Sequence, residues 1–162
     1  MSRLVFLMLL CVLPAFATAR FLHHQKPFVV QGRIYCDTCR AGFETSATTY
    51  IPGARVRIEC NDRKTQALTY SIEGVTDSTG TYKITVADDH YDQTCDAMLV
   101  SSPDPLCSEP NAGRDKARVI LTRSNGMTSN IRFANNMGFL QNEPMAKCAQ
   151  VLQMYKETDE ED

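Results

Sequence analysis

The residues most able to do chemistry are Cys36 and Cys39, in the run Tyr35–Arg40 (Tyr-Cys-Asp-Thr-Cys-Arg). A Cys-x-x-Cys pair can catalyse thiol–disulfide exchange when it begins a helix, or it can supply two thiolates to a zinc site. Here the pair follows a strand-like run and no helical period comes after it, which disfavours redox chemistry. Zinc would need a second pair or histidines at ligand spacing, and both are missing from the sequence. We therefore interpret both cysteines as structural.

Three histidines offer other candidate ligands. His23 and His24 lie in an aperiodic segment, whereas His90 lies in the loop Asp88–Asp92, whose carboxylates and imidazole could surround a cation. Calcium sites usually have more oxygen ligands and a glycine turn, so we interpret this segment as a solvated hairpin loop. No serine or cysteine stands in a nucleophile elbow, and nothing singles out a pair of carboxylates for glycoside hydrolysis. We predict no catalytic residue, no metal and no cofactor.

A signal peptide is predicted for residues 1–19. Arg3 precedes the apolar run Leu4–Phe16, and Ala17-Thr18-Ala19 provides the small residues after which a signal peptidase cleaves. The apolar run is too short to span a bilayer, which takes roughly 20 residues. No later segment is apolar enough to do so. We expect a secreted protein of the extracellular space or cell wall, without membrane insertion.

Cysteine usage agrees with this compartment. Cys11 lies in the predicted signal peptide, and the even set that remains predicts three disulfides, although spacing alone leaves their pairing open. Residues three apart on an extended strand point to opposite faces, so Cys36 and Cys39 are expected to have separate, distant partners. The formal net charge is −2, which gives no basic field for binding nucleic acid. Residues 156–162 form an acidic tail with the character of a solvated, disordered segment.

One β domain is predicted between residues 28 and 155, after a flexible lead-in at residues 20–27. Period-two alternation bounded by turn residues predicts strands at Phe28–Cys36, Ala54–Cys60, Leu68–Val75, Thr81–Ala87, Cys95–Ser101, Ala117–Arg123 and Ile131–Asn135. Gly32 interrupts the first strand and suggests a bulge or a close approach. Residues 102–113 are expected to cross irregularly, Asn125-Gly126 is a hairpin signal, and only Glu143–Tyr155 has a helical period. The fold class is therefore all-β, a small antiparallel sandwich or partly open barrel of six to seven strands with one short C-terminal helix.

Four stretches resemble the pollen Ole e 1 family of secreted plant proteins. They are Gly32–Arg40, Pro52–Cys60, Val75–Tyr82 and Arg132–Asn135, and the resemblance extends over roughly Phe28–Tyr155. The Pro-Gly-Ala-x-Val run and the following Thr-Asp-x-x-Gly-x-Tyr are also similar to transthyretin-like sandwiches. The resemblance implies a compact all-β domain whose three disulfides join Cys36 to Cys107, Cys39 to Cys148, and Cys60 to Cys95.

The family is associated with pollen and pollen tubes, and several of its members are allergens. The resemblance therefore implies a monomeric, non-enzymatic interaction or signalling module that binds a receptor-type partner, such as a receptor kinase ectodomain. The alternative is a module that binds cell-wall polysaccharide. Carbohydrate platforms depend on exposed aromatic rings, and this chain has no Trp. Only Tyr50, Tyr70 and Tyr91 lie outside expected core or helix positions, so the alternative is weaker.

The sequence also predicts that the secreted protein carries no N-linked glycan. In Asn125-Gly126-Met127-Thr128 the threonine stands one residue too far from the asparagine, and no other Asn-x-Ser/Thr exists in the chain. Treatment with an N-glycosidase should leave the electrophoretic mobility of the secreted protein unchanged. Faster migration after treatment would contradict this prediction.

Overall fold

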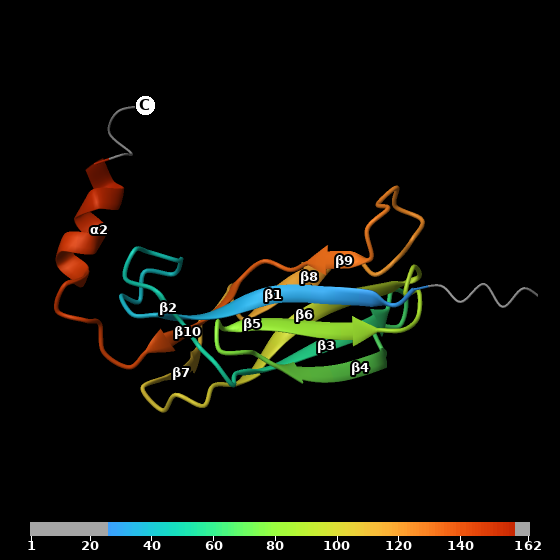
Figure 1. Cartoon of the computed structure of the whole chain (residues 1–162), viewed down its shortest axis with the longest axis horizontal. Coiled ribbons are helices and arrows are strands. Elements are labelled where there is room, and N and C mark those ends of the chain that lie inside the picture. Colours follow the sequence, from blue (N-terminus) through green and yellow to red (C-terminus); the bar gives the residue numbers. More distant parts are fainter. Residues whose placement is uncertain (1–25, 158–162) are drawn as a thin grey trace, which may run out of the picture.

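The computed structural model describes residues 26–157, so the predicted signal peptide, the lead-in up to residue 25 and residues 158–162 of the acidic tail lie outside the described part. Within that part the chain forms strands and one C-terminal helix, arranged as an elongated two-layer body (Figure 1). The elements are β1 Phe28–Asp37, β2 Thr49–Tyr50, β3 Arg55–Asp62, β4 Leu68–Val75, β5 Thr81–Val86, β6 Gln93–Ser101, β7 Cys107–Pro110, β8 Lys116–Val119, β9 Ile131–Phe133, β10 Met137–Gln141 and α2 Cys148–Glu157. The helix is too short to cross a membrane, and no described helix meets that requirement.

Strand β1 is shared by two groups of strands. Its first half, Phe28–Arg33, pairs antiparallel with β5 and parallel with β9. Its second half, from Ile34 to Asp37, pairs antiparallel with β2 and parallel with β10, and β10 continues to β7. Figure 1 shows β1 running through the middle of the molecule with these strands on either side. Most of the first sheet is therefore positioned by one strand.

The second sheet has the order β4-β3-β6-β8 and is antiparallel throughout. Alternate residues of both sheets point inward, as expected for β3 and β5, and the core includes Val30, Ile34, Val56, Ile58, Tyr82, Ile84, Val86, Val119 and Leu121. The predicted all-β sandwich with one C-terminal helix is thus confirmed, and it is not a closed barrel. It has more strands than the six to seven expected, and β9 and β10 both pair in parallel with β1.

Three disulfides tie the layers and the chain ends together. The bonds join Cys36 to Cys107, Cys39 to Cys148 and Cys60 to Cys95, with Cα–Cα distances of 6.0, 5.3 and 4.0 Å. These are the pairs that the family resemblance implies. The first attaches β7 to β1, the second attaches α2 to the turn after β1, and the third links directly paired residues of β3 and β6. Each closes a loop of 35 residues or more, so each stabilises the fold by about 3–4 kcal/mol in the chain-entropy description.

A buried carboxylate shapes the turn after β1. Asp37 is fully buried, and its carboxylate oxygens accept hydrogen bonds from the backbone N–H groups of Cys39, Ala41 and Gly42, at 3.2, 3.0 and 2.7 Å. A carboxylate is a stronger acceptor than a neutral group, and a buried one needs such partners. Asp37 therefore directs Cys39 toward the helix while Cys36 faces β7.

Thr38 and Arg40 stabilise the same turn through contacts with other segments of the chain. Thr38 donates its hydroxyl to the carbonyl of Ala47. Arg40 has a φ of 51° and donates to the carbonyl of Gln141 and the carboxylate of Glu109. The Cys-Asp-Thr-Cys-Arg signature is therefore a structural unit, as interpreted from the sequence, rather than a redox motif.

At two positions in the first sheet, a glycine leaves space for a tyrosine ring from the adjacent strand. Gly32 lies directly opposite Tyr82, and Gly138 lies directly opposite Tyr35. A Cβ atom on Gly32 would lie 2.5 Å from the Tyr82 hydroxyl oxygen, and one on Gly138 would lie 2.5 Å from Cζ of Tyr35. The pairing of β1 with β5 continues through Gly32 without a bulge. Of the two alternatives predicted for Gly32, a bulge or a close approach, the structure therefore shows the close approach of a side chain.

Three local predictions were wrong. Residues 102–113 contain a strand, β7, because Cys107 is anchored beside β10. Asn125-Gly126 forms a turn but not a hairpin, because β8 pairs with β6 and β9 pairs with β1, so the loop crosses between sheets. The helix begins at Cys148 rather than near Glu143, and it buries Val151.

The turn between β4 and β5 fits closely against β1. Asp77 accepts hydrogen bonds from the Thr79 hydroxyl and from the backbone N–H groups of Thr79 and Thr81, which lower the pKa of its carboxyl. This stabilisation is present above the carboxyl's unfolded pKa and is lost as the pH falls through its lower folded pKa. Gly80 follows with a φ of 71°, and a Cβ there would lie 2.6 Å from Cβ of Tyr50 and 3.0 Å from the Ile34 carbonyl oxygen.

We predict that Asp37→Asn destabilises the protein by about 2–3 kcal/mol, because an amide NH₂ would face buried N–H groups in place of a carboxylate oxygen. Asp62→Asn is the matched control. Asp62 accepts the same kind of turn hydrogen bonds from Lys64 and Thr65 but is only partly buried, so the loss of its carboxylate should cost clearly less. Denaturant unfolding of both variants with intact disulfides measures the difference. Equal losses would contradict the assigned role of Asp37.

We also predict that Gly80→Ala is more destabilising than Gly113→Ala. Both glycines have a positive φ, which costs an L residue about 1–2 kcal/mol. Only Gly80 is crowded, since a Cβ on Gly113 meets nothing within 4 Å. The clash at Gly80 should add about 1–3 kcal/mol. Thermal and denaturant unfolding compare the two variants, and similar stabilities would show that the turn does not press on β1 as described.

Candidate functional site

His90, the one predicted candidate ligand among the described histidines, is buried rather than solvated. It is 6% exposed, its ring lies 4.7 Å from that of Tyr70, and its Nδ1 is 2.9 Å from Oε1 of Gln93. Its backbone N–H donates to the carbonyl of Leu121. The interpretation of Asp88–Asp92 as a solvated loop is therefore wrong at its centre, because the imidazole packs against the end of the sandwich. His23 and His24 lie outside the described residues.

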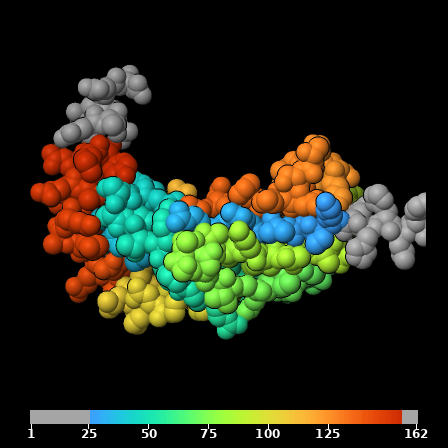
Figure 2. Space-filling model, viewed as in Figure 1, coloured from blue at the N-terminus to red at the C-terminus, as the bar shows by residue number. Residues whose placement is uncertain are grey.

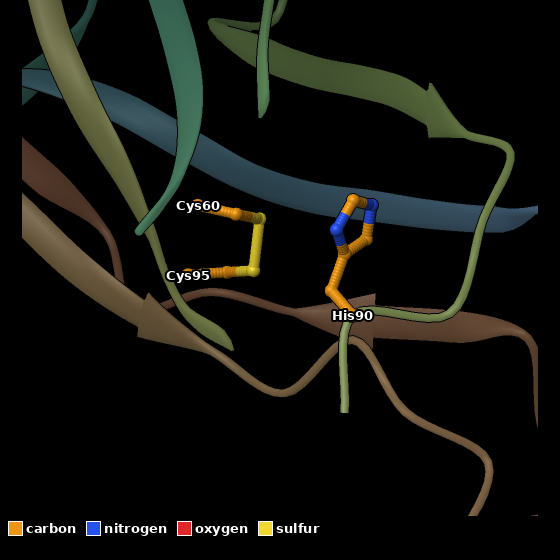
Figure 3. A group of neighbouring side chains, drawn as sticks. All are labelled: Cys60, His90 and Cys95. Atoms are coloured by element: carbon orange, nitrogen blue, oxygen red, sulfur yellow. A yellow bond between two sulfur atoms is a disulfide. The ribbon is translucent and has the colours of Figure 1, made fainter. Parts of the chain in front are cut away.

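Potential ligand atoms of Cys60, His90 and Cys95 lie within 4.8 Å of one another (Figure 3). The two sulfur atoms are bonded to each other in the Cys60–Cys95 disulfide. Metal binding by cysteine requires thiolates, and a disulfide offers none. This group therefore packs the end of the core and does not fit a zinc ion.

The loop around His90 and the loop at residues 120–130 lie at the same end of the sandwich. The backbone N–H of Arg123 donates to Asp89 at 2.9 Å, and the guanidinium of Arg123 lies 3.8 Å from the same carboxylate. Beside them is an open groove of about 440 Å³, lined by residues that include Arg63, His90 and Arg118. Arg118 is already paired with Asp96.

Strand β9 buries its charged residue and exposes its apolar residues. Arg132 is 2% exposed, whereas its neighbours Ile131 and Phe133 are 41% and 74% exposed. Ile131 and Phe133 share one face of the strand, as period-two alternation requires, and that face points to solvent. Because β9 pairs only with β1 among the described strands, it also presents an open edge.

Arg132 is held inside the sandwich by backbone carbonyls. Its guanidinium donates to the carbonyls of Ile120, Thr122, Ser129 and Ile131. It also lies 4.7 Å from the centre of the Phe28 ring, a favourable cation–π distance. Burial lowers the pKa of Arg132, and the nearby positive charge of Arg123 lowers it further.

A concave surface, here called the β9 hollow, lies over this strand. Its floor is the segment 131–136, in which Ile131 and Phe133 are exposed, and its two sides are the loop 120–130 and the loop 38–48 (Figure 2). Met127 is 49% exposed on one side, and Phe43 is 37% exposed on the other. At the latter side the hollow meets a pocket of about 550 Å³, here called the Tyr35 pocket, which is lined by Tyr35, Phe43, Glu44, Arg114, Ala134, Asn135 and Asn136.

The three tyrosines considered for carbohydrate binding are not brought together on one exposed platform. Tyr50 is half-buried, with the guanidinium carbon of Arg33 3.2 Å from its ring centre. Tyr70 is half-buried against His90, and Tyr91 is exposed. The β9 hollow and the Tyr35 pocket are sites that sequence reasoning missed. Their sequence signals are the Arg132–Asn135 stretch and, for Tyr35, the Gly32–Arg40 stretch, which carry the family resemblance but indicate no binding role.

Comparison with known proteins agrees with this fold. A model of the family described as "Pollen protein Ole e 1 like" matches residues 26–156. The pollen-specific protein C13 of Zea mays is 47% identical over 135 residues, which cover 83% of this chain and 79% of that protein. The anther-specific protein LAT52 of Solanum lycopersicum is 40% identical over 150 residues, with 92% and 91% coverage.

A solved structure shows the same architecture. The crystal structure of the major plantain pollen allergen Pla l 1 aligns with a TM-score of 0.68 and 29% identity, covering 75% of this chain and 99% of that chain. Three findings point to the same family: the matched family region, the relatives that align over most of their length, and the common fold. The chain is a member of the pollen Ole e 1-like protein family.

Proposed function

We propose that the protein is a secreted, non-enzymatic module that binds a receptor-type extracellular protein through the β9 hollow. The observation that carries this proposal is the orientation of β9, which exposes Ile131 and Phe133 while it buries Arg132. Binding to a protein partner would cover the two apolar side chains that the isolated molecule leaves in water.

The energetic argument begins with the alternative orientation. Facing β9 the other way would bury a phenylalanine and an isoleucine, each worth about 1.5–3 kcal/mol, and would leave the arginine in water. The observed orientation instead requires four carbonyl hydrogen bonds and the Phe28 ring to hold a buried cation. These contacts fix the orientation of β9 and leave Phe133 facing outward. An outward phenylalanine on a strand held in this way is best explained by a role at the surface.

The surroundings of Phe133 resemble a small protein interface. Exposed aromatic residues act as anchors in such interfaces, and polar residues form the rim. Phe133 lies opposite Gln31 of β1, with Asn135 and Asn136 following in the chain. The hollow is bounded on both sides, so a partner segment would contact the floor and one wall together (Figure 2).

The compartment and the relatives support an extracellular role in pollen. Three disulfides suit an oxidising environment. Relatives are named as pollen-specific, anther-specific or pollen-allergen proteins. We extend this to a module of the pollen, pollen-tube or cell-wall space whose partner is a membrane receptor with an ectodomain.

Phe133→Ser should abolish partner binding while the fold remains intact. The predicted loss is roughly 30-fold or more in affinity, the size expected for an interface anchor. Leu106→Ser is the matched control, since Leu106 is 63% exposed but lies in the connection to β7, away from the β9 hollow. The measurement uses the immobilised secreted protein to capture solubilised pollen-tube membrane proteins, followed by titration of the recovered ectodomain.

Two results would contradict the proposal. One is equal binding of the ectodomain by the wild type and Phe133→Ser. The other is failure to recover any receptor ectodomain together with Phe133-dependent retention on an array of wall glycans, which would favour the polysaccharide-binding alternative.

A further inference from the structure

The Tyr35 pocket is built from four separate parts of the chain. Tyr35 comes from β1, Phe43 and Glu44 come from the loop after it, and Arg114 precedes β8. The remaining wall is residues 134–136, which directly follow β9 and also form part of the floor of the β9 hollow. A ligand that lies on Phe133 is therefore within reach of the pocket.

The acidic group in the pocket, Glu44, is held by two neighbouring side chains. One carboxylate oxygen of Glu44 accepts the hydroxyl of Tyr50 at 2.9 Å, and the other accepts the side-chain amide of Asn136 at 2.9 Å. Glu44 therefore positions Tyr50 and Asn136, with one of these hydrogen bonds on each carboxylate oxygen.

The polar groups left without a partner are mainly donors. Arg114 donates from Nε to the carbonyl of Gly42 at 3.1 Å, and among residues 26–157 its guanidinium has no ion pair. Tyr35 is 1% exposed, its ring end lies against Gly138, and no hydrogen bond of its hydroxyl is found within the described part. Asn135 adds a side-chain amide that is likewise uncommitted there.

The charges of Arg114 and Glu44 both influence the Tyr35 hydroxyl. Burial raises the pKa of the Tyr35 hydroxyl, the positive charge of Arg114 opposes this shift, and the negative charge of Glu44 adds to it. Arg114, Glu44 and Tyr35 all line the same pocket. A guanidinium with free N–H groups, beside a hydroxyl and an amide, is the arrangement that binds a planar carboxylate.

We propose that the Tyr35 pocket binds the carboxylate of an acidic side chain of the protein partner. Arg114 supplies the charge and paired N–H donors, and Tyr35 and Asn135 supply further hydrogen bonds. The inference rests on the proposed function, because the same partner places an apolar side chain on Phe133. The partner motif is therefore an acidic residue close to a hydrophobic one, presented on a single extended segment or loop.

The test is a titration of the ¹⁵N-labelled full secreted protein with N-acetyl-aspartate N-methylamide, followed by NMR. We expect saturable shifts of the amides of Gly42, Phe43, Asn135 and Asn136, with a dissociation constant on the order of millimolar. The isosteric N-acetyl-asparagine N-methylamide, which lacks the charge, should shift them at least roughly tenfold more weakly. Equal binding of the two probes would overturn the proposal.

Variants locate the binding groups. Arg114→Gln should weaken binding of the aspartate probe roughly tenfold or more, and Arg114→Lys should weaken it less, because lysine keeps the charge but loses the paired donors. Tyr35→Phe keeps the ring against Gly138 and should weaken binding several-fold. Lys116→Gln removes the same charge from the exposed face of β8 and should have no effect. Unchanged affinity in Arg114→Gln would contradict the assignment.

Two further results separate this inference from the proposed function. If Phe133→Ser abolishes capture of the receptor ectodomain while Arg114→Gln leaves it unchanged, the inference fails and the proposed function stands. If galacturonate saturates the pocket and the aspartate probe does not, the site takes an acidic sugar, and the inference of a partner side chain fails. Loss of capture in both variants supports the two proposals together.

Discussion

The structure depends on how strand β1 is fixed at its C-terminal end. β1 pairs with four other strands, so any shift in its register would move most of the first sheet. The Asp37 carboxylate, the Cys36–Cys107 bond and the Cys39–Cys148 bond all act within four residues of that end. Since Cys36 and Cys39 lead to β7 and α2, the same short segment also anchors two distant parts of the chain. A Cys-x-x-Cys spacing that could serve redox chemistry is used here to direct two disulfides to different sides.

The functional proposals follow from this rigid frame. With β1 fixed, β9 and β10 align parallel to it, and β9 lies at the edge with Arg132 turned inward. The carbonyls that hold Arg132 come mainly from the loop between β8 and β9, so the buried cation also closes the side of the sandwich where the two sheets would otherwise part. Phe133 is outward as a direct consequence, and the segment that follows it lines the Tyr35 pocket. One strand orientation thus creates both the apolar and the polar part of the candidate site.

Sequence reasoning predicted the parts of the fold that depend on local pattern. The inward sets containing Ile34, Ile58 and Ile84 follow from period-two alternation, and the turn at Gly80 follows from its residues. The pattern could not decide the side of β9, because Ile131-Arg132-Phe133 shows which residues share a face but not which face is buried. Burial of Arg132 depends partly on the carbonyls of Ile120 and Thr122, ten or more residues away, and no local pattern reports their convergence. The Tyr35 pocket was equally hidden, since Phe43, Arg114 and Asn135 meet only after β1, β7 and β10 have paired.

Hydrogen exchange of the protein, alone and in complex with its captured ectodomain, tests most directly whether the β9 hollow is the binding surface. The account predicts that partner binding slows exchange at residues 131–136 and in the loops 38–48 and 120–130, while the outer face of β3 and β4, with its Arg55–Glu73 ion pair, is unchanged. Protection confined to β3 and β4, or no protection of residues 131–136 in a saturated complex, would contradict it.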